Sequence, residues 1–163
     1  MDDSDDRAYS RAPELEDLVK LCRSLNAEGV RYVLIGGFAI VLHGFVRATK
    51  DIDLLVDPSE DNVRALKRAL ATLPDNAAAE LRDDDISRYG VVRVADEIVV
   101  DVMGRACGLA YQDAVAAGID RFDVAGVEVP TGNKTFLIQT KDTVRDHDKL
   151  DVRYLQARIE EER

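Results

Sequence analysis

The chain has 163 residues, of which 46% are hydrophobic and 33% charged, with a net charge of -10 and a pI near 4.7. This length fits one ordinary domain, and the apolar content is enough for a core, which excludes wholesale disorder. The acidic balance also excludes nonspecific DNA binding, because a phosphate backbone would be repelled unless a local basic patch opposed the global charge.

No apolar run reaches the roughly 18 residues that a membrane-spanning helix needs, and the start MDDSDD is the opposite of a basic signal-peptide region. A cytoplasmic protein with no membrane association is therefore expected. Cys22 and Cys107 lack the spacing of a disulfide framework or a zinc site. Both are interpreted as small buried hydrophobic residues.

The N-terminal third begins with an acidic stretch, residues 1–12, that is predicted to be a disordered tail, and residues 13–163 are predicted to form a single domain. A first helix is expected from Pro13, with one apolar face made of Leu15, Leu18, Val19, Cys22 and Leu25. The run RYVLI at 31–35 predicts a short strand that stops at two glycines, and a helix then follows to Gly44.

The middle of the chain alternates between strand and helix patterns. The segment DIDLLVD, 51–57, predicts a strand whose acids face one side, and the helix after Pro58 carries an apolar stripe of Val63, Leu66, Leu70 and Leu73. Residues 75–87 are expected to be a polar connection. The next two strands, within 89–103, are expected to join in a tight turn around Asp96.

The C-terminal part is predicted to contain a helix at 109–117, a hairpin at 119–129 that turns near Gly126, and a helical tail over 134–160. The tail is interpreted as two helices that meet near Thr143. Together these patterns predict an α+β fold, with a mixed sheet flanked by helices.

The most informative pair of residues is Asp51 and Asp53. Carboxylates at i and i+2 on a strand point the same way, with Cα atoms about 6.6 Å apart, so their oxygens can converge on hard cations. A strand end whose acids simply face water is the alternative. Burying two carboxylates without a partner is costly, so a bound metal explains acids on a core-like strand better than packing does.

Three neighbouring features favour the metal interpretation. Gly36 and Gly37 let the backbone approach a ligand closely. Arg47, Thr49 and Lys50 come just before the acid pair and offer positive charge and a hydroxyl to phosphates. In the later strand EIVVDVM, Asp101 stands among Val, Ile and Met, so a third acid on a neighbouring strand would complete a two-metal site.

These motifs resemble the nucleotidyltransferase superfamily with the DNA polymerase β-like fold. The resemblance lies in Gly36-Gly37, thirteen intervening residues, the DIDL motif and the later strand acid. The segment GGFAIVLHGFVRATKDIDLLV is similar to sequences of the branch that contains lincosamide-type and abortive-infection-type nucleotidyltransferases. The tail resembles the C-terminal helix of that branch through Lys141, Arg145, Asp148 and Asp151.

The resemblance implies a magnesium-dependent nucleotidyltransferase that moves a nucleoside monophosphate from a nucleoside triphosphate, with ATP favoured, to a hydroxyl of an unidentified acceptor. It implies that Asp51, Asp53 and Asp101 hold two Mg²⁺ ions, or Mn²⁺ in their place. The nucleotide would lie against Gly36, Gly37, Arg47, Thr49 and Lys50. A small molecule, a tRNA or a protein remain open as acceptors, and a homodimer or a partner protein is expected to complete the short chain.

The same residues bear on several other functions. A non-catalytic nucleotide-binding or regulatory module that acts through a partner, as in a toxin–antitoxin pair, stays the main alternative. The glycines spell neither a dinucleotide fingerprint nor a P-loop. His43 and His147 are too few for a histidine-metal phosphohydrolase, so both are interpreted as structural, and Lys141 and Arg145 as surface ion pairs. Five arginines are candidates for a local basic patch: Arg82, Arg88, Arg93, Arg105 and Arg121.

Overall fold

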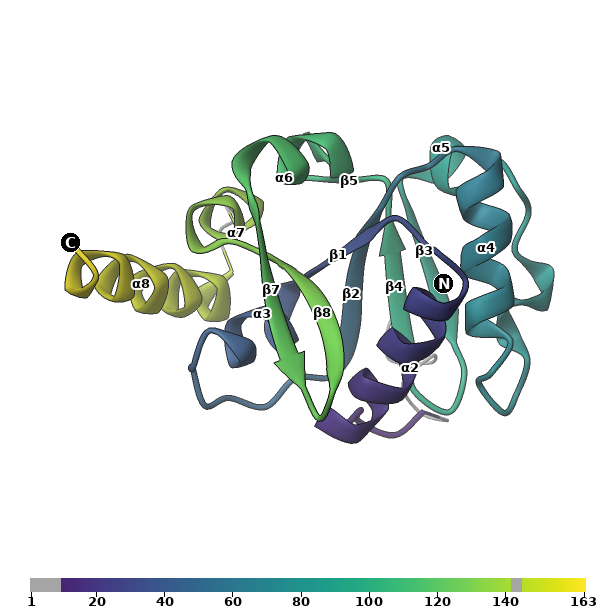
Figure 1. The fold of residues 1–163 in the computed structure, drawn as a ribbon, viewed down its shortest axis with the longest axis horizontal. Coiled ribbons are helices and arrows are strands. Elements are labelled where there is room, and N and C mark those ends of the chain that lie inside the picture. Colours follow the sequence, from purple (N-terminus) through teal and green to yellow (C-terminus); the bar gives the residue numbers. More distant parts are fainter. Residues whose placement is uncertain (1–9, 142–144) are drawn as a thin grey trace.

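The computed structural model describes residues 10–141 and 145–163 and has a six-stranded mixed sheet at its centre (Figure 1). The strand order is β3-β4-β2-β1-β8-β7, with parallel pairs β2–β4 and β1–β8 and antiparallel pairs elsewhere. The expected α+β fold with a mixed sheet is thereby confirmed. The strands are β1 (Tyr32–Ile35), β2 (Asp51–Val56), β3 (Val91–Ala95), β4 (Val99–Met103), β7 (Ile119–Val124) and β8 (Val127–Gly132).

Helices flank this sheet, and a separate two-stranded hairpin lies beside it. The point near Thr143 at which the last two helices were expected to meet lies outside the described residues. The helices are α2 (Leu15–Ala27), α3 (Gly36–Leu42), α4 (Glu60–Leu70), η1 (Ala77–Glu80), α5 (Asp85–Tyr89), α6 (Tyr111–Ala117), α7 (Lys134–Thr140) and α8 (Asp146–Glu161), and the hairpin strands are β5 (Arg105–Ala106) and β6 (Leu109–Ala110).

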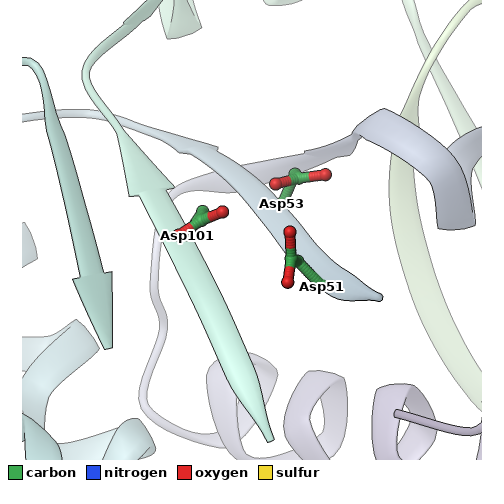
Figure 2. A group of neighbouring side chains, drawn as sticks. All are labelled: Asp51, Asp53 and Asp101. Atoms are coloured by element: carbon green, nitrogen blue, oxygen red, sulfur yellow. The ribbon is translucent and has the colours of Figure 1, made fainter. Parts of the chain in front are cut away.

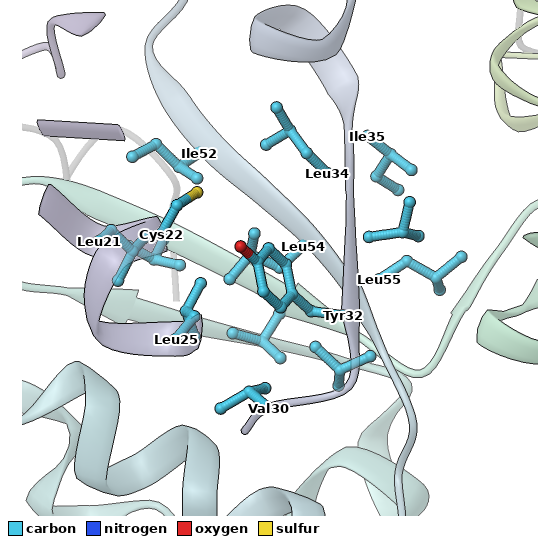
Figure 3. Close-up of a cluster of buried hydrophobic side chains, with 14 of the residues drawn as sticks. Leu21, Cys22, Leu25, Val30, Tyr32, Leu34, Ile35, Ile52, Leu54 and Leu55 are labelled. Atoms are coloured by element: carbon cyan, nitrogen blue, oxygen red, sulfur yellow. The ribbon is translucent and has the colours of Figure 1, made fainter. Parts of the chain in front are cut away.

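One face of the sheet is covered by α2, which also packs against α4. Cys22 and Leu25 lie beside Leu54 of β2 in the core (Figure 3). The expected apolar face of the first helix is correct except at its first residue, because Leu15 is 46% exposed. Leu15 is the first residue of the helix and lies about one turn before the first buried residue. The buried face includes Leu21, which the sequence prediction does not contain.

The alternation of β2 separates its two faces as the sequence predicts. Ile52 and Leu54 are fully buried toward α2, while Asp51 and Asp53 are only partly buried and point to the opposite side of the sheet. Leu55 is also fully buried, although it shares a face with the acids. The carboxylates therefore end up on the face that α2 and α4 leave uncovered.

The polar connection at 75–87 is ordered by a buried carboxylate. Asp96, which is 3% exposed at the turn between β3 and β4, accepts hydrogen bonds from the backbone N–H groups of Asp75 and Ala77, both at 2.9 Å, and of Glu97 at 2.7 Å. Full pairing removes the cost of burying this charge. The predicted turn around Asp96 is confirmed, and its side chain also fixes the start of η1.

The predicted acidic tail, residues 1–12, falls mostly outside the described residues. Within the described part, Arg11 pairs with Asp17 at 2.7 Å through two N–H groups, and its backbone N–H donates to the carbonyl of Glu97 at 2.9 Å. Among the described residues, no helix is long and apolar enough to cross a membrane.

The two cysteines differ in their surroundings. Cys22 is fully buried, and this burial raises the pKa of its thiol to about 11. Cys107 is exposed, so its prediction as a buried residue is wrong. It occupies the tight turn between β5 and β6 with a φ of 48°, a turn position that the apolar pattern of the sequence does not reveal.

Candidate active site

Three aspartates from adjacent strands converge on the open face of the sheet (Figure 2). Asp53 and Asp101 are direct partners in the parallel register of β2 and β4, and Asp51 lies two residues before Asp53. One carboxylate oxygen from each residue lies within 4.8 Å of those from the other two. The structure therefore brings together the three acids that the sequence analysis singled out.

A fourth charged residue, Arg93 of β3, completes the row across the sheet. Arg93 is the antiparallel partner of Asp101, and its Nε and Nη2 donate to the two carboxylate oxygens at 2.8 and 3.0 Å. Nη2 also lies 3.9 Å from Oδ2 of Asp51. From the sequence, Arg93 is expected only as a member of a basic patch. The turn at Asp96 was a usable signal, because a tight hairpin there places residue 93 near residue 101.

The proposed basic patch does not form as one surface. Arg93 lies on β3 and Arg121 on β7, which are the two opposite edges of the sheet. Arg121 instead lies 3.8 Å from Glu128 on the neighbouring strand. The sequence alone does not show that these arginines are far apart, because their separation depends on the order of the strands in the sheet.

The double glycine allows β1 and α3 to pass close to the acids. Gly36 has a φ of 74°, and a Cβ atom there would lie 2.0 Å from Oδ2 of Asp53. A Cβ on Gly37 would lie 2.9 Å from Oγ1 of Thr49. Real Cβ atoms essentially never make contacts this close. Gly36 therefore needs glycine for the space and for the backbone conformation, whereas a side chain at Gly37 would require Thr49 to shift.

A cavity of about 660 Å³ opens over the acids. The hydroxyl of Thr49 donates to the backbone carbonyl of Asp51 at 3.0 Å, which anchors the segment that leads into β2. Arg47 forms an ion pair with the buried Asp151 of α8. The cavity is lined by the three acids, by Arg47, Ala48, Thr49 and Lys50, by Val91, Arg93 and Met103, and by Lys141, Arg145, His147 and Asp148.

Lys141 is a mostly buried cation of this cavity, and the surface interpretation from the sequence is wrong for it. Its side chain is 9% exposed, and Nζ lies 3.1 Å from Asp148 and 3.0 Å from Asp151, both almost fully buried. Arg145 also contacts Asp148 at 2.9 Å, but its own side chain is 66% exposed. The packing of α8 against α7 creates this cluster, and helical spacing alone does not predict which face turns inward.

The two histidines have different positions. His43 is 6% exposed, its Nε2 lies 2.9 Å from the carbonyl oxygen of Gly132, and its ring meets Phe122 edge-on. Burial lowers the pKa of His43, which favours the neutral ring. This packing role agrees with the sequence interpretation. His147 is exposed at the edge of the cavity, 3.6 Å from Asp148.

The electrostatics of the three acids centre on Asp53. Desolvation, followed by the nearby charges of Asp101 and Asp51, raises the pKa of this carboxyl to about 7, against the opposing effect of Lys141 and Arg93. Above that pH the negative charge of the three carboxylates exceeds the positive charge that Lys141 and Arg93 bring to the site. The site is thus set up to gain from an added cation.

We predict that divalent-cation affinity depends on pH through Asp53. Cations bind the ionised carboxylate, so below about pH 7 binding must release a proton, and the apparent affinity should fall by up to about tenfold per pH unit. The raised pKa also means that, without metal, the contribution of Asp53 to folding stability is fully present below its ordinary pKa of 3.8 and is lost as the pH rises through about 7.

Calorimetric Mn²⁺ titrations at about pH 6 and about pH 8, each in buffers of different ionisation enthalpy, measure the affinity and the number of protons released on binding. Equal affinity at the two pH values, with no proton release at the lower one, would contradict the role given to Asp53.

Comparisons with known proteins identify the family of this chain. The chain superposes on the crystal structure of a protein described as a "putative nucleotidyltransferase", TM1012 from Thermotoga maritima, with a TM-score of 0.59 over 91% of this chain and 93% of that one, at 18% sequence identity. Residues 19–150 match the family described as the nucleotidyl transferase AbiEii toxin of type IV toxin–antitoxin systems. The chain belongs to this AbiEii family. No curated protein sequence matches it.

Proposed function

We propose that this chain transfers a nucleoside monophosphate from a nucleoside triphosphate, with ATP favoured, to a hydroxyl of an acceptor molecule and releases pyrophosphate. One observation carries the proposal: three carboxylates of adjacent strands converge beneath a cavity whose walls hold several basic side chains. Membership of the AbiEii family supports the same activity.

The donor set fits a hard divalent cation such as Mg²⁺ or Mn²⁺. Asp51, Asp53 and Asp101 offer only oxygen ligands, which these ions prefer, and the raised pKa of Asp53 reflects its burial first and then the negative charges of the other two acids. Bound there, two cations would neutralise the triphosphate and lower the pKa of the acceptor hydroxyl.

The walls of the cavity are suited to hold phosphates. Lys50 lies at the cavity and sits immediately before β2, and Arg47 and Lys141 both face it while paired with Asp151. A triphosphate in the cavity would gain charge-assisted hydrogen bonds from these groups. The bend at Gly36 and Gly37 would let the backbone approach the nucleotide without side-chain obstruction.

Asp101 is our candidate for receiving the proton in the transfer. The acceptor oxygen forms a bond to the α-phosphorus while the bond from that phosphorus to the pyrophosphate oxygen breaks. The acceptor proton would pass to a carboxylate oxygen of Asp101, which lies at the floor of the cavity.

The family name places its members in toxin–antitoxin systems, so we propose that this chain acts as the toxin of such a pair and that an antitoxin opposes it. A small molecule, a tRNA and a protein all remain candidate acceptors.

A non-catalytic nucleotide-binding module is the second candidate, and one observation favours it: Arg93 holds both oxygens of Asp101. Calorimetry with each nucleoside triphosphate, with and without Mg²⁺, separates a scaffold from an enzyme. We expect nucleotide affinity that requires Mg²⁺, whereas affinity that is independent of the metal, or absent, would count against an enzyme.

A further inference from the structure

We propose that Arg93 is a built-in counter-ion of the acidic site, which takes the cation position between Asp51 and Asp101 in the metal-free protein and must leave it when metal binds. This inference rests on the metal site of the proposed function. It adds a residue that the three-acid motif does not contain.

The position of the guanidinium group is the first reason. Nη2 of Arg93 lies 3.0 Å from Oδ2 of Asp101 and 3.9 Å from Oδ2 of Asp51, so it stands between two of the three carboxylates. Nε holds the other oxygen of Asp101 at 2.8 Å. A metal ion bridging Asp51 and Asp101 would need the same space.

Burial strengthens this competition. The side chain of Arg93 is 19% exposed and those of Asp51 and Asp101 are 14% and 10% exposed, so water screens the group weakly. Two positive centres within about 4 Å of each other repel strongly in such surroundings. Mg²⁺ also demands near-octahedral oxygen coordination at about 2.0–2.1 Å, which a guanidinium on both oxygens of Asp101 obstructs.

The strand register explains why this arginine is held in place. Arg93, Asp101 and Asp53 are direct partners across β3, β4 and β2, and the alternation of each strand turns all three to the same face. Once displaced, the side chain has room in the cavity of about 660 Å³ that it already lines. The fold can therefore exchange an internal cation for a bound one without moving a strand.

The test is a Mn²⁺ titration of Arg93→Gln without nucleotide. Binding is measured by calorimetry and by the electron paramagnetic resonance signal of free Mn²⁺. We expect the variant to bind Mn²⁺ about tenfold or more tightly than the wild type, within the range by which groups next to metal ligands change affinity. Its metal-free form should melt at a lower temperature, and saturating Mn²⁺ should reduce that difference.

Arg88→Gln is the matched control. It removes the same charge from α5, but its side chain is 61% exposed and its nearest acid, Asp84, is 4.0 Å away. Its Mn²⁺ affinity should equal that of the wild type. An Arg93→Gln affinity equal to or weaker than that of the wild type would overturn the inference, because Arg93 would then support the metal site.

A wild-type measurement covers the case in which Arg93→Gln does not fold. The Nε–H resonance of Arg93, assigned by its loss in Arg93→Lys, should be protected from solvent exchange without metal and lose that protection at saturating Mg²⁺. Protection that persists at saturation overturns the inference. If neither the wild type nor any variant binds Mn²⁺, the metal site of the proposed function itself fails, which is a different result.

Discussion

Asp53→Asn should reduce pyrophosphate release by at least about 10²–10³-fold, the loss seen when one electrostatic group of an active site is removed. The change keeps the shape of the side chain but removes the carboxylate that lies between Asp101 and the Gly36 bend. A coupled assay of pyrophosphate release with Mg²⁺ and nucleoside triphosphate measures the effect.

The same variant should be more stable than the wild type when metal is absent. At about pH 8, above the raised pKa of Asp53, the wild type holds three ionised carboxylates, whereas the variant holds two. Thermal melting in a chelator should therefore give a higher Tm for Asp53→Asn, with the gap shrinking toward about pH 5, where Asp53 is protonated in the folded state.

Asp120→Asn provides the control, because Asp120 lies on β7 at the far edge of the sheet. It should leave pyrophosphate release unchanged. Activity retained by Asp53→Asn, or lost equally in both variants, would remove Asp53 from the proposed site.

Gly36→Ala should disable the site and destabilise the fold. Comparison with Gly29→Ala separates the cost of the backbone conformation from the steric contact with Asp53. The backbone is left-handed at both glycines, with φ of 74° and 68°, so an alanine costs about 1–2 kcal/mol at either position. At Gly29 nothing lies within 4 Å of the added Cβ, but at Gly36 that atom would lie 2.0 Å from Oδ2 of Asp53.

We therefore expect the two variants to share the backbone cost, whereas only Gly36→Ala should also lose Mn²⁺ affinity and activity. Chemical denaturation gives the first quantity, and Mn²⁺ titration gives the second. Equal Mn²⁺ affinity in the two alanine variants would show that the close approach of Gly36 to Asp53 has no bearing on the site.

The floor of the site could be predicted from the sequence because it depends on local patterns. The alternation in β2 fixes the direction of Asp51 and Asp53 within one strand, and the lone acid in β4 is visible among Val and Met. Two neighbouring glycines before an apolar helix likewise mark a close approach of the backbone. The left-handed conformation of Gly36 is one that glycine adopts freely.

The rest depends on tertiary contacts that spacing does not encode. Helical spacing predicts that Lys141 is a surface residue, and only the packing of α8 places Asp148 and Asp151 beside it. Arg93 is different, because the hairpin turn at Asp96 is visible in the sequence and its register pairs Arg93 with Asp101. The exposure of Leu15 and Cys107 follows from a helix start and a turn, where apolar character does not imply burial.

Isotope position in the nucleotide tests the central claim most directly. The wild type would be incubated with Mg²⁺, a cell extract and ATP labelled at either the α- or the γ-phosphate. Nucleotidyl transfer predicts that the α-label becomes attached to an acceptor and that the γ-label leaves as pyrophosphate, with neither event in Asp53→Asn. Transfer of the γ-label to the acceptor, or release of the γ-label as free phosphate with no α-label attached, would contradict the account.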